Sequence, residues 1–214
     1  MASSSFSIDF DESQLQRVQD DLSAIKNGAK RVLNRSIAKT LTNTKTDVVN
    51  RLYARVNLSK TFIRDGDTTK RYHKGVNTWH DTNAISGRVY TTGYRVPLIY
   101  FTGTKQLASG VVKAKVLRSG SMKVLPHAFI TTLKSGHKGV FWREKIFKRK
   151  WIKGYPYANM ADKPFKFPIK QLRGPRVQDF LANKTMILQA QAYADYRLLF
   201  NTEHELDFEL SKLP

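Results

Sequence analysis

The chain has 214 residues, of which 41% are hydrophobic and 11% aromatic, a composition typical of folded rather than disordered proteins. It contains no cysteine, which excludes disulfides and thiolate metal sites, and no apolar run reaches the ~18 residues that a membrane-spanning helix needs. The formal net charge of +20, from 37 Lys and Arg against 17 Asp and Glu, leads us to expect an anionic partner.

The first predicted element is a helix over residues 10–27. Apolar side chains recur there at steps of three and four residues, the spacing of one helical face, and Asn27-Gly28 provides a stop. A second helical stretch is predicted from Leu33 to Val56 on the same criterion. Few residues between Thr40 and Thr46 favour helix, so we expect a bend or a break there.

A short third helix and a loop are predicted next. Ser59 can cap a helix that holds Phe62 and Ile63 and ends at Asp65-Gly66. Residues 67–82 are polar and show no hydrophobic period, which favours a loop or an insertion.

The hydrophobic period changes after residue 84 to the alternation that is typical of strands. Val112, Ala114 and Val116 alternate with Lys113 and Lys115, which predicts a strand with one solvated, basic face. Short strands separated by glycine turns indicate an antiparallel sheet or a small barrel.

The centre of the chain predicts a β-hairpin. β-branched and aromatic residues favour a first strand around Phe129, and Val140–Trp142 forms the returning strand. Ser135-Gly136 supplies the turn between them, because glycine adopts positive φ without steric cost. We expect Phe129 and Phe141 to lie in the core.

One more strand is predicted around Phe165, Phe167 and Ile169. Gly174-Pro175 then introduces helix, because proline fits the first turn of a helix. Leucines continue at helical spacing toward the end of the chain, and they form either intramolecular core or a docking face.

These elements predict an α+β fold with N-terminal helices, a central antiparallel β-sheet or small barrel, and a C-terminal helix. We expect one folded unit with helical arms. Its predicted parts are a helical region over 1–66, a polar loop or insertion over 67–82, a β-rich core over 83–172 and a helical region over 173–214.

Charge is unevenly distributed along the chain. No acidic residue lies between Asp81 and Glu144, whereas acids gather near both ends. We expect the basic centre to face DNA or the acidic end of a neighbouring subunit, such as Glu205 and Glu209; a solvated basic face is the third possibility. The candidate residues are Lys113, Lys115, Arg118, Lys123, Lys134 and Lys138.

Catalytic chemistry is not indicated. The sequence contains no HExxH, GxSxG or phosphate-binding loop, so we expect neither an enzyme nor a cofactor or metal site. His127 and His137 flank the hairpin and are interpreted as structural or phosphate-contacting groups. Aromatic residues from Trp142 to Tyr157 are interleaved with Lys and Arg, which suits either base stacking or a core.

Two segments carry a resemblance to a known family. The sequence LPHAFI from Leu125 to Ile130, followed by KSGHKGVFWR from Lys134 to Arg143, resembles the GAFI…SGHxGVFxR signature of the minor tail protein Z family of tailed bacteriophages, which are tail completion proteins. Phe167–Val177 is similar to that family's PIRELFGPSV segment, and Ala29–Val56 resembles its N-terminal helix more loosely. His127 stands where the family has glycine, and Arg173 stands where it has an aromatic residue. The matching positions are Ala128, Phe129, Ile130, Ser135, Gly136, His137, Gly139, Val140, Phe141, Arg143, Pro168, Ile169, Gly174 and Pro175.

The resemblance implies a structural virion protein at the head-proximal end of a phage tail, assembled in the host cytoplasm and bordering the passage of genomic DNA. It implies further copies of the chain in a hexameric ring, with the tail terminator, the tail tube or sheath and the neck or connector proteins as partners, and no membrane. A free, sequence-nonspecific nucleic-acid-binding protein remains the alternative.

Overall fold

The computed structural model describes residues 3–9, 12–22, 27–67, 72–143 and 169–212. It divides the chain into two compact units, where the sequence predicted one. We call Met1–Val96, Leu117–Ser119 and Pro175–Pro214 the helical unit, and Pro97–Val116 and Gly120–Gly174 the β unit. Helices toward both ends and antiparallel sheets between them confirm the α+β class.

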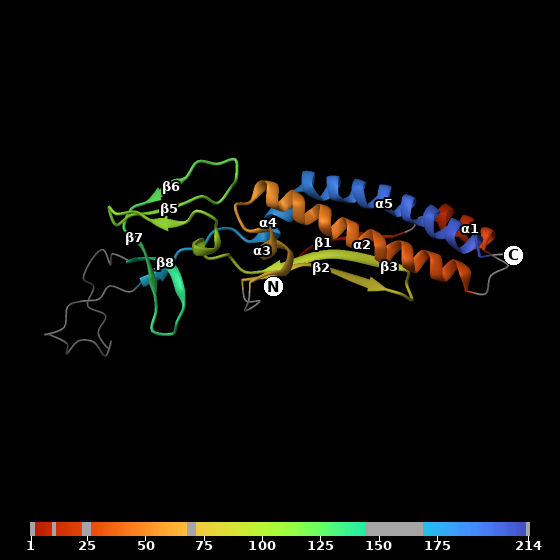
Figure 1. The fold of residues 1–214 in the computed structure, drawn as a ribbon, viewed down its shortest axis with the longest axis horizontal. Coiled ribbons are helices and arrows are strands. Elements are labelled where there is room, and N and C mark those ends of the chain that lie inside the picture. The colour runs from red at the N-terminus through yellow and green to blue at the C-terminus, as the bar shows by residue number, and fades with distance from the viewer. Residues whose placement is uncertain (1–2, 10–11, 23–26, 68–71, 144–168, 213–214) are drawn as a thin grey trace, which may run out of the picture. The chain divides into compact units, whose positions relative to one another are not determined.

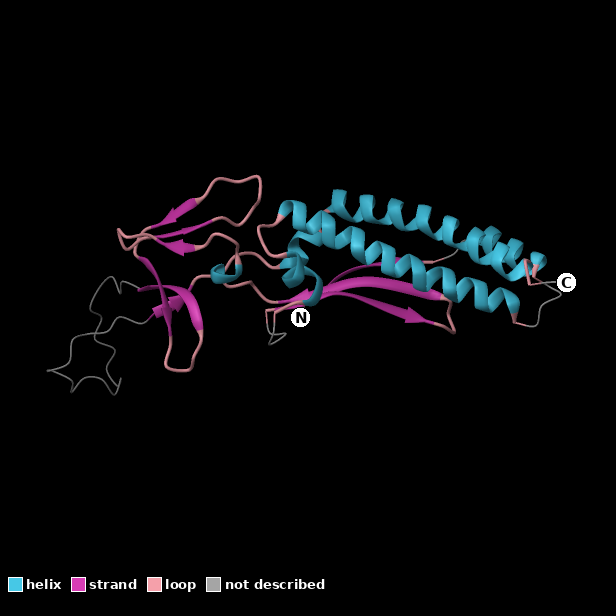
Figure 2. Ribbon diagram, viewed as in Figure 1, coloured by secondary structure: helices cyan, strands magenta, loops and turns pink. Residues whose placement is uncertain are grey.

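The helical unit packs long helices on a three-stranded sheet. Figures 1 and 2 show α2 and α5 side by side on one side of that sheet. The strand order is β1-β3-β2, and both pairings are antiparallel. Its elements are β1 (Ser3–Ile8), α1 (Glu12–Asp21), α2 (Gly28–Arg55), α3 (Lys60–Asp65), β2 (His73–Asp81), β3 (Ser86–Gly93), α4 (Val177–Leu181) and α5 (Lys184–Leu210).

Two predictions about the first helices were wrong. Asn27 adopts the left-handed conformation, with φ 59°, immediately before α2, so Asn27-Gly28 starts the second helix instead of ending the first. α2 also runs unbroken through the threonine-rich stretch from Thr40 to Thr46. Packing against α5 outweighs the weak helix propensity there, since the buried Thr40 hydroxyl accepts a 2.9 Å hydrogen bond from the Asn201 amide.

The prediction of a loop over residues 67–82 was also wrong, because β2 occupies His73–Asp81. His73 is buried, and its Nε2 lies 2.9 Å from the Ile63 carbonyl oxygen, so a polar side chain fills an interior position. The N-terminal strand β1 was missed, although Phe6 and Ile8 are buried and alternate with the exposed Ser5 and Ser7. Only pairing with β3 gives either segment its ladder of hydrogen bonds.

The β unit holds two three-stranded antiparallel sheets, with strand orders β4-β5-β6 and β7-β8-β9. The antiparallel prediction is confirmed, and in the described residues these sheets remain separate and do not close into a barrel. The strands are β4 (Lys105–Gln106), β5 (Val112–Ala114), β6 (Lys123–Leu125), β7 (Ala128–Thr132), β8 (Lys138–Arg143) and β9 (Ile169–Gln171), with a 3-10 turn, η1, at Leu98–Tyr100. None of the helices in the described part of the chain is both long and apolar enough to cross a lipid bilayer.

Candidate functional site

The hairpin predicted at the centre of the chain is formed by β7 and β8. Phe129 pairs with Phe141 in its register, and the two ring centroids lie 6.4 Å apart. Phe141 is buried as expected, whereas Phe129 is only half-buried. Gly136 has φ +79° in the turn, which confirms the reason for a glycine there.

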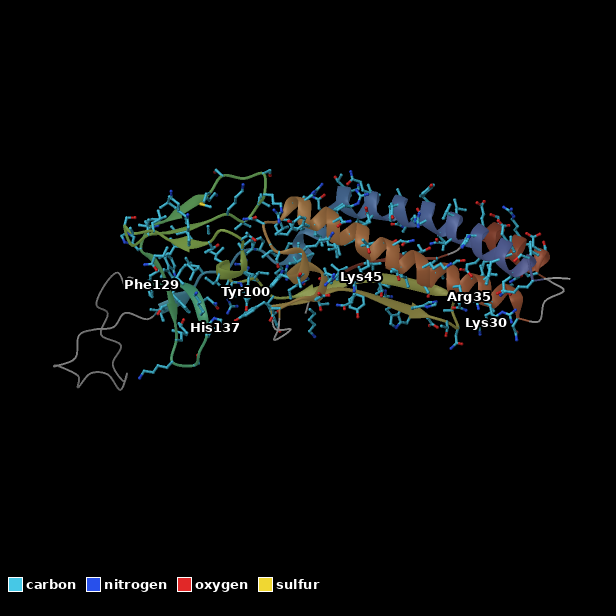
Figure 3. The ribbon with its side chains drawn as sticks, viewed as in Figure 1. Lys30, Arg35, Lys45, Tyr100, Phe129 and His137 are labelled. Atoms are coloured by element: carbon cyan, nitrogen blue, oxygen red, sulfur yellow. The ribbon has the colours of Figure 1, made fainter. Side chains whose placement is uncertain are left out.

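The two segments that resemble the phage family meet in one sheet. β8 pairs with β9, so that Phe141 lies opposite Gln171. Figure 3 labels His137 and Phe129 in this part of the chain. His137 Nε2 lies 2.7 Å from the Gln171 side-chain nitrogen, and the His137 ring meets the Phe141 ring edge-on at 6.3 Å. A Cβ on Gly139 would lie 2.9 Å from the Phe141 ring and 3.0 Å from the Gln171 amide nitrogen, which explains the glycine.

Gly174 also has a steric reason to be glycine. A Cβ there would lie 2.8 Å from the ring of Phe101, which is itself buried. The neighbouring Leu172 carbonyl accepts a hydrogen bond of 3.1 Å from the Leu98 amide, which fixes the end of β9 beside η1. Residues 169–174 of the second motif segment are therefore part of the packing of the β unit.

Most positions of the family motif serve architecture. Ala128, Gly139, Val140 and Phe141 are buried, and Phe129, Ile130, His137, Gly174 and Pro175 are half-buried. Ser135, Gly136 and Ile169 are exposed. Arg143 ends β8, and Pro168 lies outside the described residues, as do Phe165 and Phe167 of the predicted last strand. The left-handed φ of 64° at His127, just before β7, is a conformation that suits the family's glycine.

The β unit contains much of the acid-free, basic part of the sequence. The described residues of the β unit include nine Lys and Arg and no Asp or Glu. Lys134 and Lys138 are exposed on the hairpin's turn, and Lys123 is exposed on β6. Lys113 and Lys115 are half-buried. The acid-free surface holds five of the six candidate residues.

Arg118, the sixth candidate, has a different role. It belongs to the helical unit, where its guanidinium donates to the backbone carbonyls of Tyr53 and Leu58 and lies 3.8 Å from the Tyr53 ring centroid. These intramolecular contacts account for its charge. No sequence signal could have predicted them, since Arg118 lies 65 positions from Tyr53 and 60 from Leu58.

Glu205 and Glu209 were expected to face a neighbouring subunit, and the structure corrects this. Both lie in the helical unit with side-chain exposures of 5% and 2%. Their partners are on the same chain. Arg35 reaches Glu209 at 2.7 Å and Arg31 reaches it at 3.2 Å, while Lys39 pairs with Glu205. Hydrogen bonds from Lys212 first, and then from Arg31, lower the pKa of Glu209 although burial opposes them.

Aromatic stacking residues are placed only in part. Trp142 is 40% exposed on β8, so it is not the core residue that one interpretation required. Trp151, Tyr155 and Tyr157 lie outside the described residues. Within the described part of the chain, no group of three or more His, Asp or Glu side chains is arranged to hold a metal ion.

No protein-family model, curated protein or solved structure matches the chain.

Proposed function

We propose that this chain is a structural protein of a tailed-bacteriophage virion, which completes the head-proximal end of the tail and borders the passage of DNA as one of several copies in a ring. One observation carries the proposal. The two segments that resemble the tail completion family, although separated in sequence, form adjacent strands of a single unit whose described residues contain no acid.

The electrostatics of the β unit support contact with DNA. Sequence-independent binding to a duplex needs cations opposite phosphates, and nearby carboxylates would oppose it. Lys134 and Lys138 are exposed beside the turn at Gly136, while the neighbouring motif residues Val140 and Phe141 are buried. The hairpin thus presents two exposed lysines in a unit whose described residues include no acid, and these two residues are the ones we place nearest DNA.

The test is inactivation of the gene in the tailed phage whose genome carries it, with complementation by variants. Loss of the protein should leave particles whose filled heads lack joined tails or lose their genomes, as seen by electron microscopy. Complementation with Lys134→Glu and Lys138→Glu together should assemble tails but reduce genome retention or ejection. Lys30→Glu with Lys60→Glu is the matched control, because both lysines are exposed near helix starts in the helical unit.

Normal particles and normal infectivity without the gene would refute the proposal. If instead the purified chain stays monomeric, binds DNA tightly and is absent from virions, it is a free nucleic-acid-binding protein.

A further inference from the structure

Helix α5 carries large apolar side chains on its exposed side as well as on its buried side. Ala194 and Leu198 are buried, at 0% and 3% exposure. On the other side Leu188, Tyr196 and Leu199 remain 58%, 63% and 48% exposed. At about 100° per residue these three side chains project within about 80° of one another, and Tyr196 lies about 160° from the buried pair. Three large apolar side chains exposed within one sector of a helix are typical of a surface that binds a partner.

The same outer face carries acids. Asp195, Glu203 and Asp207 are exposed and lie at helical positions that flank Tyr196 and Leu199. None of the three forms an ion pair with another described residue, in contrast to the buried Glu205 and Glu209. We call these three acids and the three exposed apolar side chains the outer face of α5. Its chemistry fits a surface that is apolar and basic.

The chain itself has such a surface in the sheet β4-β5-β6. Lys105, Lys113 and Val124 form one row across the three strands, since Lys113 pairs with both of the others. Val124 is 51% exposed, and Met122, two residues earlier, is 42% exposed. Val112 and Ala114 point to the opposite, buried side of β5. We call Lys105, Lys113, Met122 and Val124 the basic sheet face.

We propose that the outer face of α5 binds the basic sheet face of a second copy of this chain. Apolar side chains meet at the centre of the contact, and lysines face carboxylates around them. The contact joins two different surfaces, so a bound pair keeps one free surface of each kind and further copies can add until a ring closes. The proposed contact depends on the proposed function only because that function places several copies of the chain in one tail.

The contact is tested by analytical ultracentrifugation of the purified full chain over a wide range of concentration at low salt. Wild type should self-associate. Glu203→Lys with Asp207→Lys should weaken association roughly tenfold or more, because each reversal replaces an attraction with a repulsion. Lys105→Glu with Lys113→Glu should weaken it similarly. The chain carrying all four changes should associate again, because the charges are exchanged between the two faces.

Two further variants keep the test decisive. Asp20→Lys with Asp21→Lys changes the net charge equally on exposed positions of α1 and should associate like wild type. Tyr196→Ser with Leu199→Ser should weaken association at high salt as well, where charge is screened. Far-ultraviolet circular dichroism checks that each variant is folded.

A wild-type chain that stays monomeric throughout would overturn the inference, and so would a fourfold variant that does not regain association. Association that survives the lysine reversals would show that α5 binds a different surface. The two proposals fail under different results. If the gene is essential for tails but the purified chain is monomeric, only the contact proposed here is refuted. If the chain self-associates but the gene is dispensable, only the proposed tail function is refuted.

Discussion

Replacing Phe141 by alanine should open the β unit without loosening the helical unit. The Phe141 side chain is 4% exposed, and its ring contacts Phe129 across the hairpin and His137 beside the turn. Truncation removes a buried aromatic ring and leaves a cavity, which costs about 3–5 kcal/mol. Phe129 is half-buried, so Phe129→Ala should cost roughly half as much.

Hydrogen exchange measured by mass spectrometry can follow both units in one full-length sample. A loss of about 3–5 kcal/mol corresponds to exchange roughly a hundredfold to several thousandfold faster for the amides of β7 and β8. Amides of α2 should keep their protection and serve as the internal reference. Thr132→Ala, at the exposed end of β7, is the control and should change exchange little. Unchanged protection of β7 and β8 in Phe141→Ala would show that the hairpin's core is built on other residues.

Three other changes test the turn, a cap and an ion-pair cluster. Gly136→Val should cost about 1–2 kcal/mol or more, because its φ of +79° is strained for a β-branched residue; an unchanged melting temperature would contradict this. Ser59→Ala should cost about 1 kcal/mol, since the Ser59 hydroxyl accepts the Phe62 amide at the start of α3, and Ser59→Asp should restore it in urea unfolding. The lowered pKa of Glu209 predicts stability that is fully present above its ordinary value of 4.5 and lost as pH falls through the folded pKa. Glu209→Gln should flatten that acid-side dependence in melts between neutral and acidic pH, and an unaltered profile would place the dependence elsewhere.

The sequence predicted the motif hairpin because its information is local. Gly136 is needed where φ must be positive, and β-branched and aromatic residues on both sides select strands, so β7, β8 and their turn followed from a few neighbouring residues. The cap at Ser59 followed in the same way. Alternation also predicted β5, with Val112 and Ala114 buried, although the strand ends at Ala114 and does not reach Val116.

The sequence by itself determined the α+β class, the antiparallel centre and the absence of acids between Asp81 and Glu144, because composition and hydrophobic period are properties of adjacent residues. Only the tertiary structure decided which charged side chains find partners within the chain. Arg118 donates to the carbonyls of Tyr53 in α2 and of Leu58 just after it. Glu205 and Glu209 are buried against α2, which no spacing rule connects to them. Tertiary structure also makes the polar segment after residue 72 a strand, β2, because β3 supplies its hydrogen bonds and the buried His73 ring pairs with the Ile63 carbonyl. Pairing over long sequence separations is a property of the packed chain. Only the packed chain therefore separates the exposed acids of α5 from the buried, ion-paired ones.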